Sequence, residues 1–365
     1  MDITKNFQNK KIAIIGGGPI GLFLAIKLSK MGHSVELFEK GTWPRDKVCG
    51  QGIMPSGLQL LKSIGVKFET NEFSCQFNGI EYIDGNQIVS GLLPTPGRGI
   101  KREVLSEKLY SMALQQKNLK LFSQYEIQDP SILNQYAKIF ACDGMNSPTR
   151  KFLQMEKKRK GPLRIGARVH YACPPWSKNV QIYWGDGVEA YITPISPSQV
   201  EVTYLWYQDK INKGAYLEKR LLHFFPQLEN KLKGYKRIND FKAYGPFSAV
   251  SKKNSIGKLF FVGDAYQFLD GITGEGISLG LKTANILAEN FEDYTLLVKL
   301  KIKILYFNYS LFVSLALILS RHKNFRKFIF KILKRFPNIF KLLLSLNDIN
   351  PSGEIESENF LKQAS

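Results

Sequence analysis

The sequence predicts an α/β fold in which strand–helix–strand segments are interleaved with an antiparallel β-sheet and followed by helices. Three observations lead to this prediction. Residues 11–39 have the pattern of a short apolar strand, an amphipathic helix and an alternating strand. Short alternating segments separated by turn residues fill residues 73–97 and 165–207. Residues 294–346 combine apolar residues at helical spacing with many basic residues.

The composition is that of a folded protein of 365 residues, long enough for two compact lobes. Hydrophobic residues make up 44% and charged residues 22%, which excludes a disordered or fibrous chain. The four cysteines include no Cys-x-x-Cys pair and the four histidines do not cluster, so we expect neither a disulfide framework nor a metal site. The first residues are polar and form no apolar leader, so we expect a cytoplasmic protein.

Changes of pattern along the chain predict interleaved domains. The first domain is expected in three pieces, residues 1–72, 98–160 and 252–293. The antiparallel domain is expected in two pieces, residues 73–97 and 161–251. A basic, amphipathic helical segment and an acidic polar tail follow, at residues 294–347 and 348–365. Asp84-Gly85 between two alternating runs predicts a β-hairpin. Helical spacing recurs at residues 22–31, 56–64, 102–114, 217–225 and 277–290.

Three glycines separate the first strand from the first helix, Gly16, Gly18 and Gly21, in a Gly-x-Gly-x-x-Gly pattern. This spacing permits a tight turn and lets the backbone approach a pyrophosphate at the helix N-terminus. Glu39 ends the next strand, where a carboxylate accepts hydrogen bonds from ribose hydroxyls. Because a carboxylate there would repel the 2′-phosphate of NADP, the pattern predicts a Rossmann-type domain that binds NAD or FAD.

Two later strand ends carry an aspartate beside a glycine. Asp143-Gly144 follows an apolar strand and leads to Ser147 and Arg150. Gly263-Asp264 follows the apolar run 258–262, and the glycine-rich stretch 271–276 then precedes a helix. An aspartate–glycine pair alone is most often a simple turn. The interpretation therefore depends on finding all three motifs in this order along one chain.

In this order the motifs resemble those of the para-hydroxybenzoate hydroxylase-like flavoprotein superfamily, over roughly residues 11–290. That superfamily includes aromatic monooxygenases, flavin-dependent halogenases and geranylgeranyl reductases. The resemblance implies a Rossmann-type FAD-binding domain and an antiparallel substrate domain, with the flavin at their junction. It implies FAD contacts from the first glycines and Glu39, from Arg102 within Gly99–Leu109, from Asp143 and Gly144 at the pyrophosphate, from Asp264 at the ribityl chain, and from the backbone at Gly274, Gly276 and Ile277.

Two residues of the loop after the second strand are candidates for catalysis. Arg45 stands where the superfamily often has a mobile basic residue that contacts the flavin, or it is a solvated surface arginine. Cys49-Gly50 resembles a pair near the flavin in the geranylgeranyl reductase branch, so Cys49 either faces the isoalloxazine or is a small buried turn residue. Residues 273–276, Thr-Gly-Glu-Gly, resemble the same branch, and Gly271 stands where the superfamily usually has proline.

The antiparallel region supplies aromatic residues with a period of two, among them Tyr183, Tyr191 and Tyr204. We expect them either to line a substrate pocket or to be ordinary sheet packing. His170 is a further candidate acid–base. The Trp-x-Trp-x-Ile-Pro stretch of the halogenases is missing, which disfavours halogenation. No second Gly-x-Gly-x-x-Gly occurs, so we expect NAD(P)H to bind only transiently, as a reductant.

The net charge of +20 is concentrated towards the C-terminus. Residues 294–347 contain eleven Lys and Arg and no Asp or Glu, and residues 304–320 form an uncharged run of seventeen. Three interpretations are open: helices that lie on an anionic membrane surface, a helical cap over the FAD domain, or a membrane span near the lower length limit. Nucleic-acid binding is disfavoured, because the basic residues interleave with an apolar stripe.

The motifs together predict an FAD-dependent oxidoreductase. We expect a monooxygenase in which NAD(P)H reduces the flavin and O2 forms a flavin C4a-hydroperoxide that hydroxylates an organic substrate. The first alternative is a reductase that transfers hydride to a C=C bond of a polyprenyl lipid. The second alternative is a non-catalytic, membrane-attached flavin-binding assembly factor.

Overall fold

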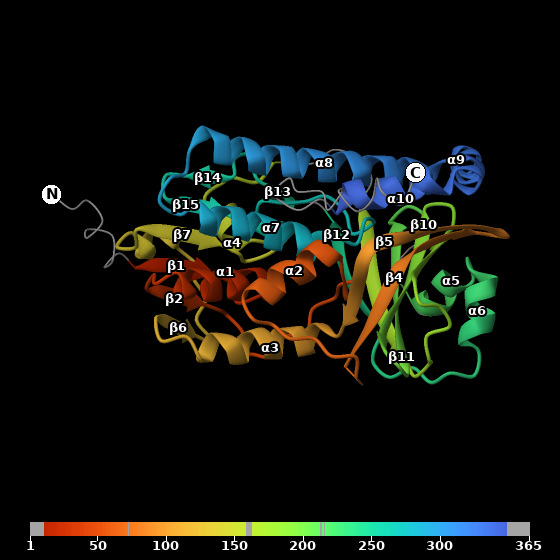
Figure 1. Ribbon diagram of the computed structural model, residues 1–365, viewed down its shortest axis with the longest axis horizontal. Helices are drawn as coiled ribbons and strands as arrows, with labels where there is room; N and C mark the ends of the chain where they lie inside the picture. Colours follow the sequence, from red (N-terminus) through yellow and green to blue (C-terminus); the bar gives the residue numbers. More distant parts are fainter. Residues whose placement is uncertain are drawn as a thin grey trace.

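The computed structural model describes residues 11–71, 73–157, 163–211, 214, 216–247 and 249–348. In these residues two large sheets lie side by side, and helices run along both of them (Figure 1). A third, two-stranded sheet pairs β13 (Ala249–Val250) with β16 (Gln267–Phe268). Sheet A has six strands in the order β14-β15-β7-β1-β2-β6. Their bounds are β1 Ile12–Ile15, β2 Val35–Phe38, β6 Leu119–Phe122, β7 Lys138–Ala141, β14 Ser255–Ile256 and β15 Leu259–Phe261. All neighbouring pairs are parallel except β14–β15, so five carboxyl strand ends meet at one edge.

Apolar packing on both faces explains why the strands of sheet A are short and apolar. One face packs against α1 (Pro19–Lys30), α3 (Arg102–Leu114) and α7 (Gly276–Glu289), with α2 (Pro55–Ser63) alongside α7. The other face packs against the short 3₁₀ helix η2 (Pro130–Leu133) and the segment after α4 (Pro148–Phe152). Helix α1 begins with Pro19, whose fixed φ suits the first helical position. This arrangement places the loops of the three sequence motifs at one edge of sheet A.

Sheet B has eight strands in the order β12-β8-β11-β10-β9-β4-β5-β3. Their bounds are β3 Gly52–Ile53, β4 Ser74–Asp84, β5 Gln87–Ile100, β8 Arg164–Tyr171, β9 Val180–Trp184, β10 Val188–Ser196, β11 Gln199–Tyr207 and β12 Lys242–Phe247. A separate apolar core lies between one face and the helices α5 (Leu217–Leu222) and α6 (Pro226–Leu232). The opposite face packs against the domain of sheet A and the C-terminal helices. Neighbouring strands of sheet B are antiparallel except β4 and β9, which are parallel, so the predicted α/β fold with an interleaved, largely antiparallel sheet is confirmed.

The predicted hairpin forms β4 and β5, but β5 is longer than the pattern indicated. It continues through Pro94 and Pro96 to Ile100, so one strand crosses the expected boundary between residues 97 and 98. Gly99 pairs with Gly52 of β3, which also joins a piece of the expected first domain to sheet B. The expected boundary at residues 160–161 lies outside the described residues, as does the tail after Asp348.

The basic C-terminal segment forms three helices, α8 (Leu296–Arg321), α9 (Lys323–Arg335) and α10 (Pro337–Asn347). Helix α8 runs along the edge of the molecule above sheet A and reaches sheet B, where α9 and α10 pack (Figure 1). Its inner side chains are buried at helical spacing, at Val298, Ile302, Tyr306, Tyr309 and Val313. By length and composition α8 is also the one helix among the described residues that passes as a candidate membrane span. The segment thus caps the sheet A domain.

Candidate functional site

The three glycines of the first motif lie between β1 and α1 and serve different purposes. Gly16 has a φ of 100°, which favours glycine. A Cβ on Gly21 would overlap the Gly16 carbonyl oxygen, so Gly21 lets the helix start close to the strand. A Cβ on Gly18, the N-cap of α1, would meet nothing within 4 Å. The first turn of α1, whose N–H groups have no partner within a helix, is therefore open to an anion.

Glu39 lies directly after β2 and faces this glycine turn. It is 2% exposed, and its carboxylate accepts hydrogen bonds from the backbone N–H groups of Gly17 and Gly41, each at 2.7 Å. It also pairs with Arg45, so the predicted catalytic candidate Arg45 lies beside the glycine turn. Trp43 donates from Nε1 to the Gly17 carbonyl at 2.8 Å and covers the same turn. Trp43 lies outside the sequence motifs that predicted this site.

The loop that begins with Asp143-Gly144 follows β7 at the same sheet edge. Asp143 Oδ2 accepts a hydrogen bond from the Thr149 N–H at 3.1 Å, and Oδ1 is buried without a hydrogen-bond partner among the described residues. Burial raises the pKa of Asp143. The buried guanidinium of Arg150 donates to the carbonyls of Met145 (2.5 Å) and Ala265 (2.8 Å). Arg150 therefore joins this loop to the third motif.

Asp264 and Arg102 bring opposite charges to the centre of the sheet edge. Asp264 lies in the 3₁₀ turn η3 (Gly263–Ala265) directly after β15. Burial raises its pKa, and the nearby charges of Lys47 and Arg102 oppose that rise. Burial lowers the pKa of Arg102, whose Nη1 has no hydrogen-bond partner among the described residues. Lys47 lies beside Gly144, where a Cβ would be 3.3 Å from its Nζ, so this cation, which the sequence analysis did not assign to the site, belongs to it.

The glycine-rich loop before α7 completes the group of loops at this edge of sheet A. We call these loops, with Glu39 and Arg102, the cradle. Gly274 has a φ of 70° and open space where its Cβ would be. A Cβ on Gly276, the first residue of α7, would lie 3.9 Å from Asp264 Oδ1. Gly276 and Ile277 thus begin a second helix whose N-terminus adjoins the Asp264 carboxylate. The side chain of Glu275 is buried, and burial raises its pKa well above the ordinary range although Lys282 lowers it.

Sheet B separates the three predicted substrate-contact tyrosines. Tyr191 lies on the face towards sheet A, and its hydroxyl donates to the Ile272 carbonyl in the glycine-rich loop. Tyr183 and Tyr204 lie on the opposite face, in the apolar core beneath α5 and α6. Because side chains alternate across a strand, Ala190, the residue before Tyr191, belongs to that second core. The structure therefore brings only Tyr191 of the three to the candidate site.

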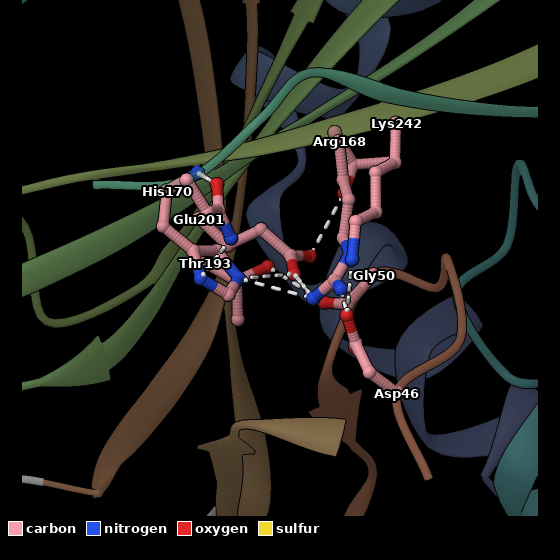
Figure 2. Close-up of polar contacts among 9 residues, drawn as sticks. Asp46, Gly50, Arg168, His170, Thr193, Glu201 and Lys242 are labelled. Atoms are coloured by element: carbon pink, nitrogen blue, oxygen red, sulfur yellow. Dashed lines mark hydrogen bonds and ion pairs between the residues drawn. The ribbon is translucent and has the colours of Figure 1, made fainter. Parts of the chain in front are cut away.

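A polar network occupies the inner face of sheet B next to the loop after β2 (Figure 2). Arg168 is 1% exposed, pairs with Asp46 of that loop, and lies 3.7 Å from the carboxylate of Glu201. Glu201 is fully buried and lies 3.2 Å from Nε2 of His170. Lys242 pairs with Asp46 at 3.0 Å. A continuous chain of charged groups thus leads from the buried Glu201 to Lys242 near the surface.

The partners of His170 determine the role of its ring Nδ1. The backbone N–H of His170 donates to Asn239 Oδ1 at 2.9 Å, which turns the amide nitrogen of Asn239 towards ring Nδ1, also at 2.9 Å. An amide nitrogen can only donate, so Nδ1 accepts. The other ring nitrogen, Nε2, lies 3.2 Å from both the Glu201 carboxylate and Arg168 Nη1. At the outer end, burial tends to raise the pKa of Asp46, but the hydrogen bond from Lys242 and the charge of Arg168 lower it overall.

Cys49 lies between this network and the cradle. The carbonyl of the next residue, Gly50, accepts a hydrogen bond from Thr193 of β10 at 3.1 Å, which holds the loop against sheet B (Figure 2). Burial raises the pKa of the Cys49 thiol, while the charge of Arg102 lowers it less strongly. The thiol therefore keeps its proton at neutral pH.

The described residues fit an FAD molecule at the junction of the two sheets. Two helix N-termini, at Gly18 and Gly276, adjoin turns with open space where a Cβ at Gly18 or Gly274 would be. Arg102 Nη1 and Asp143 Oδ1 are a buried donor and a buried acceptor without partners among the described residues. Glu39 stands where a ribose would be held. No group of three or more metal-ligating residues occurs in the described part of the chain.

Comparisons with known proteins agree with this geometry. A family model described as pyridine nucleotide-disulphide oxidoreductase matches residues 2–91. The 1H-pyrrole-2-carbonyl-(peptidyl-carrier protein) brominase of Pseudoalteromonas luteoviolacea is 23% identical over 76% of this chain and 75% of its own. The menaquinone reductase of Mycobacterium tuberculosis is 20% identical over the same shares of the two chains, 76% and 75%. The crystal structure of p-nitrophenol 4-monooxygenase from Pseudomonas putida matches with a TM-score of 0.75 and 16% identity, over 93% of this chain and 99% of that one.

These findings define the fold of the molecule. The chain has the fold of the FAD-dependent oxidoreductases related to para-hydroxybenzoate hydroxylase. Similar solved structures include a flavoprotein/dehydrogenase, flavin-dependent halogenases and a monooxygenase. The chain spans between 56% and 75% of the length of the first curated relatives that it matches.

Proposed function

We propose that this chain is an FAD-dependent monooxygenase that uses NAD(P)H and O2 to hydroxylate an organic substrate. The observation that carries the proposal is the meeting of three loops of sheet A with the inner face of sheet B. Helix N-termini, unpartnered buried groups and a polar network surround one junction. Redox chemistry of a flavin needs such a site, in which the protein supplies position, charge and exclusion of water.

Each part of the cradle would hold one part of FAD. Glu39 would accept hydrogen bonds from the ribose, and the first turn of α1 would bind the pyrophosphate with Lys47 nearby. Asp264 would hold the ribityl chain, and Arg102 would donate to the cofactor beside it. The backbone at Gly274, Gly276 and Ile277 would face the ring.

When bound, FAD would supply the chemistry of hydride acceptance from NAD(P)H and of oxygen transfer from O2 to the substrate, and Asp264, Arg102 and the backbone at Gly274, Gly276 and Ile277 would hold it in place. The balance is one NAD(P)H, one proton, one O2 and R–H on one side, and NAD(P)⁺, water and R–OH on the other.

The chain's own residues would position charge and hold protons. The buried pair of Glu201 and His170 can hold a proton, and Arg168, which stays charged, links Glu201 to Asp46. Tyr306 and Tyr309 of α8 contact the loop of the third motif.

A second candidate function, reduction of a C=C bond in a lipid, is favoured by Cys49. A hydride from the reduced cofactor would reach one carbon and a proton would reach the other. Because burial raises the pKa of Cys49, its thiol keeps a proton that it could donate. The likeness to a menaquinone reductase also supports this candidate.

The first experiment is anaerobic reduction of the flavin in the purified protein, followed by rapid mixing with oxygenated buffer. A transient absorbance spectrum that differs from those of reduced and oxidised flavin supports the monooxygenase. Direct return to oxidised flavin, with and without unsaturated lipids and hydroxylatable aromatics present, would contradict it and favour the reductase. A bound flavin that neither NAD(P)H nor dithionite reduces would contradict both and support a non-catalytic flavin-binding factor.

A further inference from the structure

Helix α8 has two apolar faces on opposite sides. Its inner residues are buried against the cofactor domain. Half a turn away, eight large apolar side chains are exposed over the whole length of the helix, with Leu296 82% and Phe307 67% exposed. From Leu297 onward these outer residues recur every three or four positions, and the full set is Leu296, Leu297, Leu300, Ile304, Phe307, Leu311, Leu315 and Ile318. A helix that only capped a soluble domain would present polar residues there.

The exposed apolar surface continues onto the two following helices, which pack against α8 and against each other. Their exposed apolar residues are Phe325, Phe328, Phe336, Ile339, Leu342, Leu343 and Leu346. We call these residues and the eight of α8 the outer apolar face. Basic side chains accompany it and are exposed, at Lys299, Lys301, Lys303, Lys323, Lys327, Lys331, Lys334 and Arg335. Residues 294–347 contain no acidic residue.

We propose that the outer apolar face of α8, α9 and α10 docks onto an anionic lipid bilayer, with α8 lying in the interface. A large apolar face bordered by lysines has the chemistry of a helix that inserts its apolar side among acyl chains while its cations meet lipid phosphates. A second copy of the chain is a poorer occupant, because two segments of eleven positive charges would face each other. A membrane span is a poorer fit, because the inner face of α8 is buried against protein.

The docked helix is in direct contact with the candidate cofactor site. The hydroxyl of Tyr306 donates to the Gly263 carbonyl at 3.3 Å, and that of Tyr309 donates to the Asp270 carbonyl at 2.8 Å. One helix, about 10 Å thick, therefore separates the lipid from the loop of Asp264. The proposal stands on the exposed face alone and does not depend on the reaction.

The test is flotation of the full-length, flavin-loaded protein with lipid vesicles. We expect binding to vesicles of phosphatidylglycerol and phosphatidylcholine, weaker binding to phosphatidylcholine alone, and partial loss in 0.5 M salt because salt screens the charges. Phe307→Glu with Leu311→Glu should lower the partition coefficient by roughly a hundredfold, since two large apolar side chains leave the lipid. Flavin absorbance of each sample reports that the cofactor domain is folded.

The matched control replaces two equally exposed apolar residues elsewhere, Leu114→Glu with Ile132→Glu. Leu114 ends α3, on the side of the molecule away from α8 (Figure 1), and is 61% exposed. This control should bind vesicles like the unmodified chain. The proposal would be overturned by loss of binding in the control, or by no binding of the unmodified chain to anionic vesicles. A dimer in light scattering that dissociates in the Phe307/Leu311 variant, without vesicle binding, would assign the face to a second copy.

Discussion

Gly18 offers the sharpest test of the cofactor site at the scale of single residues. A Cβ at Gly18 meets no protein atom within 4 Å, and its φ of −72° suits any residue. Gly18→Ala should therefore fold with a free energy of unfolding within about 0.5 kcal/mol of the unmodified chain. Its methyl group would fill the space proposed for the pyrophosphate, so the Kd for FAD, measured by fluorescence titration of the apoprotein, should rise by about tenfold to a hundredfold.

Gly21 is the contrasting position in the same turn. A Cβ there overlaps the Gly16 carbonyl oxygen. Gly21→Ala should therefore lower the melting temperature whether or not FAD is present. Unchanged FAD affinity in Gly18→Ala would show that the pyrophosphate does not bind at this turn.

The buried carboxyl of Glu275 leads to a prediction of how the stability of the chain depends on pH. Burial raises the pKa of its carboxyl well above the ordinary value of about 4.5, so the folded chain holds this proton more tightly than the unfolded chain. Stability must then fall as pH rises above about 4.5, where the unfolded chain releases the proton first. Glu275→Gln removes this loss, so it should raise the melting temperature more at pH 7.5 than at pH 4.5. Thermal unfolding with Glu107→Gln, on exposed α3 surface, is the control. An equal effect of Glu275→Gln at both pH values would show that the carboxyl is ionised in the folded chain.

Most residues of the cradle, among them Glu39, Asp143 and Asp264, could be predicted from the sequence because each lies within a local motif, whereas Trp43 and Lys47 lie outside these motifs. The polar network could not be predicted in the same way. Arg168 and Glu201 are brought together by strand pairing, and Asp46 joins them from a loop 122 positions away. Period-two spacing identified Tyr183, Tyr191 and Tyr204 as sheet residues, but it does not say which face packs against which domain. The face of each tyrosine follows from whether its position in β9, β10 or β11 is odd or even. Which face meets the sheet A domain is known only from the assembled structure.

At the scale of elements, Arg326 links the turn between α8 and α9 to the β4–β5 hairpin. It is 1% exposed, its Nε donates to Asp84 at 2.9 Å, and its Nη1 donates to the carbonyls of Leu319 and Ser320. Arg326→Met would leave the Asp84 carboxylate without its cation, which costs about 3–5 kcal/mol when the pair is buried. Urea unfolding should show this loss.

A second variant separates charge from packing at this contact. Arg326→Met with Asp84→Asn removes the uncompensated charge and should recover part of the stability. If the double variant is as unstable as the single one, the arginine acts through its hydrogen bonds to the carbonyls of α8 and not through the ion pair.

Element boundaries were predictable where apolar spacing and turn residues agreed, as in α3, which the sequence predicted at residues 102–114. Element boundaries were not predictable where a strand continues through prolines, which usually end a strand. Pro94 and Pro96 lie within β5, whose partner β4 shifts register between Phe77 and Gly79. For α8 the sequence showed an apolar run, but both of its faces are apolar. Only packing against the protein distinguishes the inner face from the outer one.

At the scale of the whole molecule, the C-terminal helices belong to the fold as well as to a surface. Tyr306 and Tyr309 contact the loop of the third motif, and Asp348, after α10, accepts hydrogen bonds from Ser56 at the start of α2. Phe330 and Phe340 pack on Tyr82 of sheet B. The segment therefore closes both sheets at once, and a membrane-docked face would be rigidly connected to the cofactor cradle.

This arrangement predicts that the C-terminal segment cannot be removed as a separate anchor. A chain ending at Asp293 would expose the surface now covered by Val298, Ile302 and Val313, so we expect it to aggregate, or to melt roughly 10 °C or more below the full chain and lose flavin. A chain ending at Asp348 keeps α8 to α10 and their contact with Ser56, so it should match the full chain in melting temperature and in flavin absorbance. Size-exclusion chromatography with absorbance at the flavin band compares the two. A monodisperse chain of residues 1–293 with a full complement of flavin would show that the helices only attach to the fold, and membrane binding could then be assigned to them by deletion alone.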